Sequence, residues 1–139
     1  MEALYFNPLF VSPSNHKYDT QDYDHIDPHL TVIPEDKGRL LYPTEADNRN
    51  AERYRKRTTD PVNLEASDAY FAHFIEEAHR RGIRVIMDGV FNHCGSFHKW
   101  MNREQLYRAE IGYAEGAFSS ANTPYREYFR FDADGRYEC

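Results

Sequence analysis

The sequence has few of the features that mark disulfide-rich, membrane-spanning or nucleic-acid-binding proteins. Only two of its 139 residues are cysteines, Cys94 and Cys139, which is too few for a disulfide framework, so we expect free thiols. No apolar run approaches the ~18 residues that a membrane span needs, and the short apolar stretch after Met1 does not suit a signal peptide. With 17 basic against 23 acidic residues, the net charge of -6 argues against a nucleic-acid partner.

The composition is that of a globular protein with much of its chain near water. Hydrophobic residues make up 40% and charged residues 29%, and the mean hydropathy of -0.85 is low for a chain with a closed core. We therefore expect long solvated loops, or surfaces that pack on something outside this chain. Aromatic residues reach 15%, with 11 Tyr, whose flat face and hydroxyl suit polar ligands. Half-buried surface is the simpler explanation for the same residues.

Two apolar runs and the helix between them predict a βαβ unit. Residues 3–11 have the character of a buried strand, residues 67–81 of a helix, and residues 83–88 of a second, β-branched strand. The expected helix boundaries are Ser67 or Asp68 at the start and Gly82 after the end. Its buried face is expected to carry Phe71, Phe74, Ile75 and Ala78. Because the second strand follows the helix so closely, the two strands should be parallel.

The remaining segments carry weaker signals. Residues 14–66 are polar and contain four prolines, which predicts an elaborated surface loop, with a short helix over residues 50–57 as one option. Residues 97–115 are compatible with a helix. Residues 123–129 begin with Thr-Pro, which favours a short helical turn, and residues 132–135 predict a turn between short strands.

Polar side chains gather where the two predicted strands end. In parallel α/β folds, ligands bind at the carboxyl ends of the strands, so loops 12–23 and 88–93 should emerge side by side. Together they supply Asn15, His16, Lys17, Tyr18, Asp19, Asp22, Asn92 and His93. Such hydrogen-bonding groups beside a flat aromatic ring suit a polyhydroxylated ligand such as a sugar.

These two loops resemble a known family. Asp88-Gly-Val-Phe-Asn-His93 is similar to the first signature segment of the α-amylase family of retaining glycoside hydrolases, at the end of barrel strand three. Tyr5-Phe-Asn-Pro-Leu-Phe10 resembles strand two. Ser14-Asn-His-Lys-Tyr-Asp-Thr20, followed by Asp22-Tyr23, is most similar to the neopullulanase and cyclomaltodextrinase subgroup.

The resemblance implies an α/β fold that is part of a (β/α)8 TIM barrel. Residues 1–93 would form strands two and three with helix two, interrupted by an inserted loop at about 31–66. Residues 94–139 would begin the small domain that protrudes after strand three. Because a TIM barrel takes ~200–250 residues, we expect this chain to be a fragment of a longer protein.

The resemblance also implies roles for four residues. Tyr18 matches the aromatic residue that stacks under the sugar at the cleavage subsite, and His93 matches a histidine that hydrogen-bonds one of its hydroxyls. Asp88 matches an aspartate that holds an arginine beside the nucleophile. Asn92 matches a calcium ligand of many α-amylases, although this subgroup often lacks that calcium and no cofactor is required.

From the residues alone, simpler roles stay open. Asp88 can cap the turn that follows its strand, His93 can be a structural histidine, and Tyr18 can cover apolar surface. His93, Cys94 and His98 suggest zinc, but zinc sites need three or four ligands at known spacings, so we do not expect one.

The expected function is that of a glycoside hydrolase acting on α-glucosidic bonds of maltooligosaccharides, cyclodextrins or pullulan. The nucleophile and acid/base of this family come from strands four and five, which lie outside these residues, so the fragment alone should be inactive. The alternatives are a non-catalytic α-amylase-like protein that serves binding or partner assembly, and an independent carbohydrate-binding module. The subgroup resemblance also favours a cytoplasmic location and allows a homodimer of the full-length protein.

Overall fold

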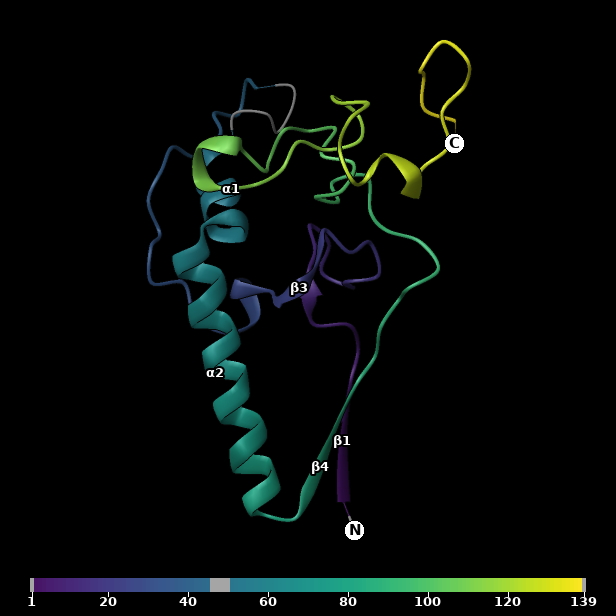
Figure 1. Cartoon of the computed structure of the whole chain (residues 1–139). Helices are drawn as coiled ribbons and strands as arrows, with labels where there is room; N and C mark the ends of the chain where they lie inside the picture. The colour runs from purple at the N-terminus through teal and green to yellow at the C-terminus, as the bar shows by residue number, and fades with distance from the viewer. Residues whose placement is uncertain (1, 46–50, 139) are drawn as a thin grey trace.

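The computed structural model describes residues 2–45 and 51–138 and shows a mixed α/β arrangement (Figure 1). Strands β1 and β4 run side by side next to the long helix α2, and the C-terminal third lies at the opposite end from the N-terminus. The elements in chain order are β1 (Glu2–Phe6), β2 (Phe10–Val11), β3 (Asp22–Ile26), η1 (Pro28–Leu30), α1 (Glu52–Thr59), α2 (Pro61–Arg80), β4 (Ile83–Met87), η2 (Ala109–Ile111) and η3 (Arg126–Tyr128).

The predicted parallel βαβ unit is confirmed. β1 pairs with β4 in parallel, from Glu2 opposite Ile83 to Phe6 opposite Met87. The first strand is shorter than the expected span of residues 3–11 and is followed by the separate strand β2. Pro8 lies in this break, and its ring removes the N–H that a continuous ladder would use.

Helix α2 begins at Pro61, six residues earlier than expected. The Asp60 side chain caps it by accepting a hydrogen bond from a first-turn N–H at 3.0 Å. The expected caps lie inside the helix and bind β3 instead. Ser67 Oγ donates to the Ile26 carbonyl at 2.8 Å, and Asp68 Oδ1 accepts from the Ile26 N–H at 2.9 Å. The cap prediction was therefore wrong, because both side chains have long-range partners on β3.

The end and the buried face of α2 agree with the prediction. Gly82 follows the helix with a φ of +73°, a conformation that glycine adopts without strain. Phe71 and Ala78 are buried. Phe6 of β1 contacts the rings of Phe71 and Phe74 at centroid distances of 6.2 and 5.7 Å. These aromatic contacts hold the helix against the β1–β4 pair.

The described residues within the segment 14–66 form more regular structure than the surface loop that we expected. β3 pairs antiparallel with β2, and α1 largely matches the short helix allowed over residues 50–57. Polar contacts hold this region: the Asn63 side chain donates to the Glu35 carbonyl at 3.0 Å and accepts from its N–H at 2.9 Å. Arg57 binds Asp36 through two hydrogen bonds of 2.8 Å. A segment organised by polar pairs shows no apolar periodicity, which explains why β3 was not predicted.

The expected helix over residues 97–115 is wrong. Only η2 forms there, and Asn102 and Gln105 have positive φ angles of 47° and 54°, which an α-helix excludes. The expected turn at residues 123–129 contains η3. The turn at residues 132–135 is confirmed, closed by an antiparallel bridge between Phe131 and Tyr137.

The segment after β4 packs on the residues that precede β3. The Gly95 N–H donates to the Thr20 carbonyl at 2.9 Å, and the Lys99 N–H donates to the Gln21 carbonyl at 3.0 Å. Whether residues 94–139 begin a separate small domain stays a prediction. Within residues 2–45 and 51–138, no helix has the length and apolar character needed to cross a membrane.

Candidate functional site

Asp88 lies where β4 ends, at the carboxyl edge of the parallel pair. Its N–H donates to the Phe6 carbonyl at 3.0 Å, which extends the ladder by one residue. Its Oδ1 accepts from the Gly89 N–H at 2.9 Å. The turn-capping contact that we considered as an alternative is therefore present, and the same carboxylate also faces β1.

Tyr5 of β1 connects Asp88 to the loop that carries Tyr18. Partial desolvation and a hydrogen bond with Asp88 raise the pKa of the Tyr5 phenol, and the nearby Tyr18 adds to the shift. The strand end of β4 and the loop after β2 thus approach each other at Tyr5. This is the juxtaposition expected from parallel neighbours.

Tyr18 projects from its loop with 41% of its surface exposed. Its ring stacks on the His16 imidazole, with centroids 5.9 Å apart and planes 26° apart. The Tyr18 N–H donates to His16 Nδ1 at 3.2 Å. His16 therefore supports the Tyr18 ring through both a stacking contact and a hydrogen bond to its backbone.

His93 is exposed and borders a cavity of about 450 Å³. Its Nδ1 lies 3.1 Å from Asn92 Oδ1, and its carbonyl accepts from the Tyr23 hydroxyl at 2.6 Å. The volume is within the range of small-molecule sites. The cavity is lined by Tyr23, Phe91, Asn92, His93, Cys94, Trp100, Tyr128 and Phe129.

Aromatic rings give this cavity most of its wall. Trp100 lies 5.8 Å from the Tyr23 ring and 5.1 Å from the Tyr128 ring, measured between centroids. Neither Trp100 nor Tyr128 was assigned to the site from sequence. The only available signal was the high aromatic content, because the two residues come from a segment without regular periodicity.

Tyr5 lies near both Asp88 and Tyr18. His93 and Asn92 line the cavity of about 450 Å³, and neither Tyr18 nor Asp88 is among its lining residues. Within the described part of the chain, no hydrogen bond or ring contact joins Tyr18 to His93 directly. The sugar-binding and supporting roles of these four residues stay predictions.

Two of the polar loop residues have structural partners instead of an open position. Lys17 is 8% exposed, and its Nζ lies 2.5 Å from Asp27 Oδ2. Asp22 is fully buried, and its Oδ1 lies 2.6 Å from Lys99 Nζ. The expectation that both would face a ligand was wrong, because each is held in a buried ion pair.

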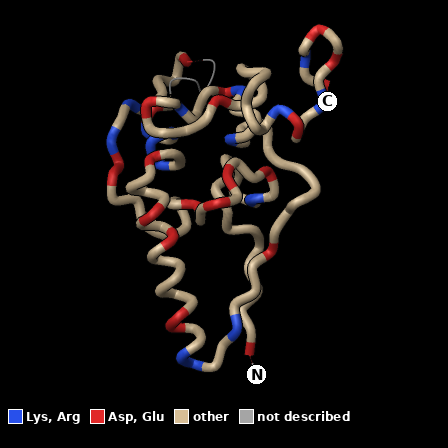
Figure 2. Tube along the Cα trace, in the orientation of Figure 1, with Lys and Arg blue, Asp and Glu red and all other residues tan. Residues whose placement is uncertain are grey.

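Carboxylates are concentrated on the segment that contains β3 (Figure 2). Lys99 binds both Asp22 and Asp24 there. Its hydrogen bond to Asp24 lowers the pKa of that carboxyl against the opposing effect of burial. Lys99 therefore balances part of the negative charge of Asp22 and Asp24.

His98, in the segment after β4, is a buried neutral histidine. It is fully buried, and its Nδ1 accepts from the Trp100 N–H at 3.1 Å, while Nε2 has no partner. Burial, with the nearby Lys99 charge, lowers its pKa from 6.5 to about 4. This side chain is consequently uncharged at neutral pH.

The described residues do not form a metal site on their own. No group of three or more His, Cys, Asp or Glu side chains among them is placed to hold a metal ion. Asn92 offers one side-chain oxygen, already within hydrogen-bond distance of His93, whereas calcium takes six to eight oxygen ligands. A calcium-binding role for Asn92 stays a prediction.

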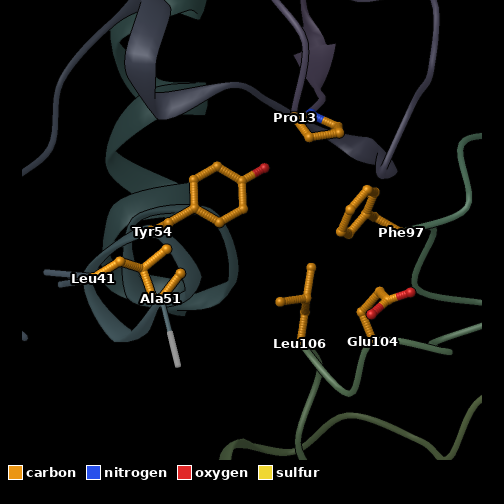
Figure 3. Close-up of a pocket in the computed structure, with 7 residues that line it drawn as sticks. All are labelled: Pro13, Leu41, Ala51, Tyr54, Phe97, Glu104 and Leu106. Carbon is orange, nitrogen blue, oxygen red and sulfur yellow. The ribbon is translucent and has the colours of Figure 1, made fainter. Parts of the chain in front are cut away.

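A second cavity, of about 270 Å³, lies between the segment around α1 and the chain after β4 (Figure 3). Tyr54 and Phe97 lie on opposite walls. Its lining consists of Pro13, Leu41, Ala51, Tyr54, Phe97, Glu104 and Leu106. None of the residues expected to bind sugar lines this cavity, which is therefore distinct from the candidate site.

The parallel β1–β4 pair with polar side chains at its carboxyl edge is the arrangement in which ligands bind in parallel α/β folds. Residues 66–138 match the family described as alpha amylase, catalytic domain. This match covers more than half of the chain, and the chain belongs to the α-amylase family.

The chain is also similar to several characterised relatives. It is 31% identical over 142 residues to an amylopullulanase of Thermoanaerobacterium thermosulfurigenes, covering 100% of this chain and 6% of the relative. It is 38% identical over 93 residues to neopullulanase 2 of Thermoactinomyces vulgaris, covering 67% and 10%. A cyclomaltodextrinase of Geobacillus thermopakistaniensis is 35% identical over 93 residues, with the same coverage.

The alignments cover different shares of this chain and only a small share of each relative. The chain spans only 6% to 10% of the length of these relatives. The alignment with the amylopullulanase covers the whole chain and so runs through residues 31–66, whereas those with the other two cover two thirds of it. Whether residues 31–66 are an insertion stays a prediction.

Proposed function

We propose that this chain is part of the catalytic domain of a retaining glycoside hydrolase that acts on α-glucosidic bonds of maltooligosaccharides, cyclodextrins or pullulan. The observation that carries the proposal is the parallel β1–β4 pair, whose carboxyl edge holds Asp88 beside Tyr5 and the Tyr18 loop. Membership of the α-amylase family and the names of the relatives support this class of substrate.

In this proposal Tyr18 forms the flat surface on which the sugar ring at the cleavage subsite stacks. Its exposed position and its support by His16 suit that role. His93 donates or accepts a hydrogen bond with a sugar hydroxyl through its exposed imidazole. Asp88 acts indirectly, by holding an arginine that a neighbouring strand would supply.

The exposed face of the sheet supports placement in a larger barrel. Phe6 packs on α2, so the alternation of side chains puts its neighbour Tyr5 on the opposite face. Tyr5 and its register partner Ile86 are 63% and 48% exposed there. Parallel sheets are normally covered on both faces. We assign β1 and β4 to barrel strands two and three, and α2 to helix two.

The isolated 139-residue chain is predicted to release no sugar. Retaining hydrolysis requires two carboxyl groups ~5–5.5 Å apart, and in this family they come from strands that these residues do not include. The test incubates the purified chain with maltotriose, a cyclodextrin and pullulan and measures reducing ends. Turnover that survives repurification would contradict the assignment of the missing groups.

The complete protein that contains this chain provides the positive test. It should hydrolyse maltotriose with retention of the anomeric configuration, observed by NMR, and Tyr18→Ala and His93→Ala should each lower kcat/KM. Tyr42→Ala is the control, because Tyr42 is 62% exposed and is not among the residues that line the cavity beside His93. A complete protein that binds maltotriose without cleaving it would favour a non-catalytic, sugar-binding relative instead.

A further inference from the structure

Lys17 is an unusual lysine, because it is almost completely buried one residue before Tyr18. It is 8% exposed, and lysine is rarely buried unless its charge is paired. Its Nζ lies 2.5 Å from Asp27 Oδ2 and donates to the Ser12 carbonyl at 3.0 Å. Moving the ammonium group away from Asp27 would leave a buried charge without its counter-charge, which is strongly destabilising. The Lys17 side chain is therefore held in this position.

The acceptor of this ion pair is itself rigidly held. Asp27 is fully buried, its Oδ1 accepts from the His29 N–H at 2.9 Å, and its Oδ2 accepts from the Ser12 N–H at 3.1 Å. Burial alone would raise the pKa of Asp27, but hydrogen bonds from His29 and Lys17 outweigh it and lower that pKa. Asp27 is therefore ionised at neutral pH and provides a fixed negative anchor.

The backbone at Lys17 needs such an anchor. Its φ of +63° lies in the left-handed region, which non-glycine residues adopt uncommonly and only where surrounding contacts hold them. The Lys17 N–H donates to Ser14 Oγ at 3.2 Å. Side chain and backbone thus fix the same turn.

Tyr18 stands between this anchor and a second one. On its other side, Asp19 Oδ1 accepts hydrogen bonds from Ser12 Oγ at 2.7 Å and from Ser14 Oγ. Tyr18 is the exposed residue of a turn that is held on both sides. A ring presented in this way loses little conformational freedom when a ligand binds.

We propose that Lys17 is a positioning residue for Tyr18: its buried ammonium group, bound to Asp27 and the Ser12 carbonyl, fixes the left-handed turn that orients the Tyr18 ring toward substrate. This inference rests on the proposed sugar-binding role of Tyr18. It assigns Lys17 no contact with the substrate.

The test is a double-mutant cycle in the complete protein, with kcat/KM for maltotriose as the readout. Lys17→Met should lower kcat/KM on the order of 10- to 100-fold, the loss that a small misplacement of a binding group can cause. In a Tyr18→Ala background, the same change should lower it by less than about twofold, because the ring that it positions is gone. Thermal unfolding should show a similar loss of stability in both backgrounds.

Lys99→Met is the matched control. Lys99 is also nearly buried and paired with an aspartate, at 2.6 Å from Asp22. Among the described residues, its hydrogen bonds and ion pairs reach Gln21, Asp22 and Asp24, and none reaches the turn at residues 14–19 that presents Tyr18. Its effect on kcat/KM should be the same with and without Tyr18. Should Lys17→Met fail to fold, Lys17→Gly replaces it, since glycine accepts the backbone conformation while lacking the ammonium anchor.

The outcomes separate the two proposals. If Tyr18→Ala alone leaves kcat/KM unchanged, the sugar-binding role of Tyr18 fails and the positioning role of Lys17 fails with it. If Tyr18→Ala lowers kcat/KM and Lys17→Met causes an equal further loss in both backgrounds, Tyr18 keeps its role and Lys17 is only a stabilising residue.

Discussion

The buried imidazole of His98 should make the stability of the folded chain depend on pH between about 4 and 6.5. In the folded state its pKa is lowered to about 4, firstly by burial and secondly by Lys99, with Asp24 opposing. Protonation of Nδ1 would also break the hydrogen bond from the Trp100 N–H. In the unfolded chain the same group has a pKa near 6.5.

The sign and the size of this effect follow from proton linkage. Between pH 6.5 and 4 the unfolded chain binds a proton that the folded chain excludes, so the free energy of unfolding falls as the pH falls. The stability that His98 contributes is complete above pH 6.5 and is lost by about pH 4. The difference between the two pKa values corresponds to about 3 kcal/mol.

The assay is urea unfolding of the 139-residue chain from pH 7.5 to 4, followed by the fluorescence of Trp100, its single tryptophan. His98→Gln keeps a hydrogen-bond acceptor for the Trp100 N–H but does not titrate. All other titrating groups are common to both proteins. The stability advantage of the original chain over His98→Gln should therefore shrink by about 3 kcal/mol from pH 7 to pH 4. A difference that stays constant across this range would refute the reasoning.

Two further predictions concern α2. Phe71→Ala should lower the free energy of unfolding by about 3–5 kcal/mol, because Phe71 is 8% exposed and packs on Phe6. Tyr70→Ala, at a position 53% exposed, is the control in the same urea titration and should lower it far less. Asp60→Ala should lower the free energy of unfolding by about 1 kcal/mol, because the cap on the Val62 N–H is lost. Asp60→Asn should retain most of that stability, because its amide oxygen can still accept the hydrogen bond. Equal losses for both substitutions in thermal unfolding would mean that the carboxylate charge matters more than the cap.

The position of the candidate site followed from local patterns in the sequence. The spacing of Phe71 and Ala78 marked the buried face of a helix, and Gly82 marked its end. The β-branched run that follows implied a parallel partner, so the polar loops had to meet at one edge. Such elements are predictable because each buries one regular face, which leaves a period in the sequence.

The chain by itself therefore determined the βαβ unit, the family and the residues at the strand ends. Only the tertiary structure decided that Ser67 and Asp68 bind β3 and that Lys17 is buried against Asp27. It also decided that residues around Trp100 line a cavity beside His93. The physical reason is that a polar side chain becomes a core residue only when a distant partner satisfies it, and a local pattern contains no trace of that partner.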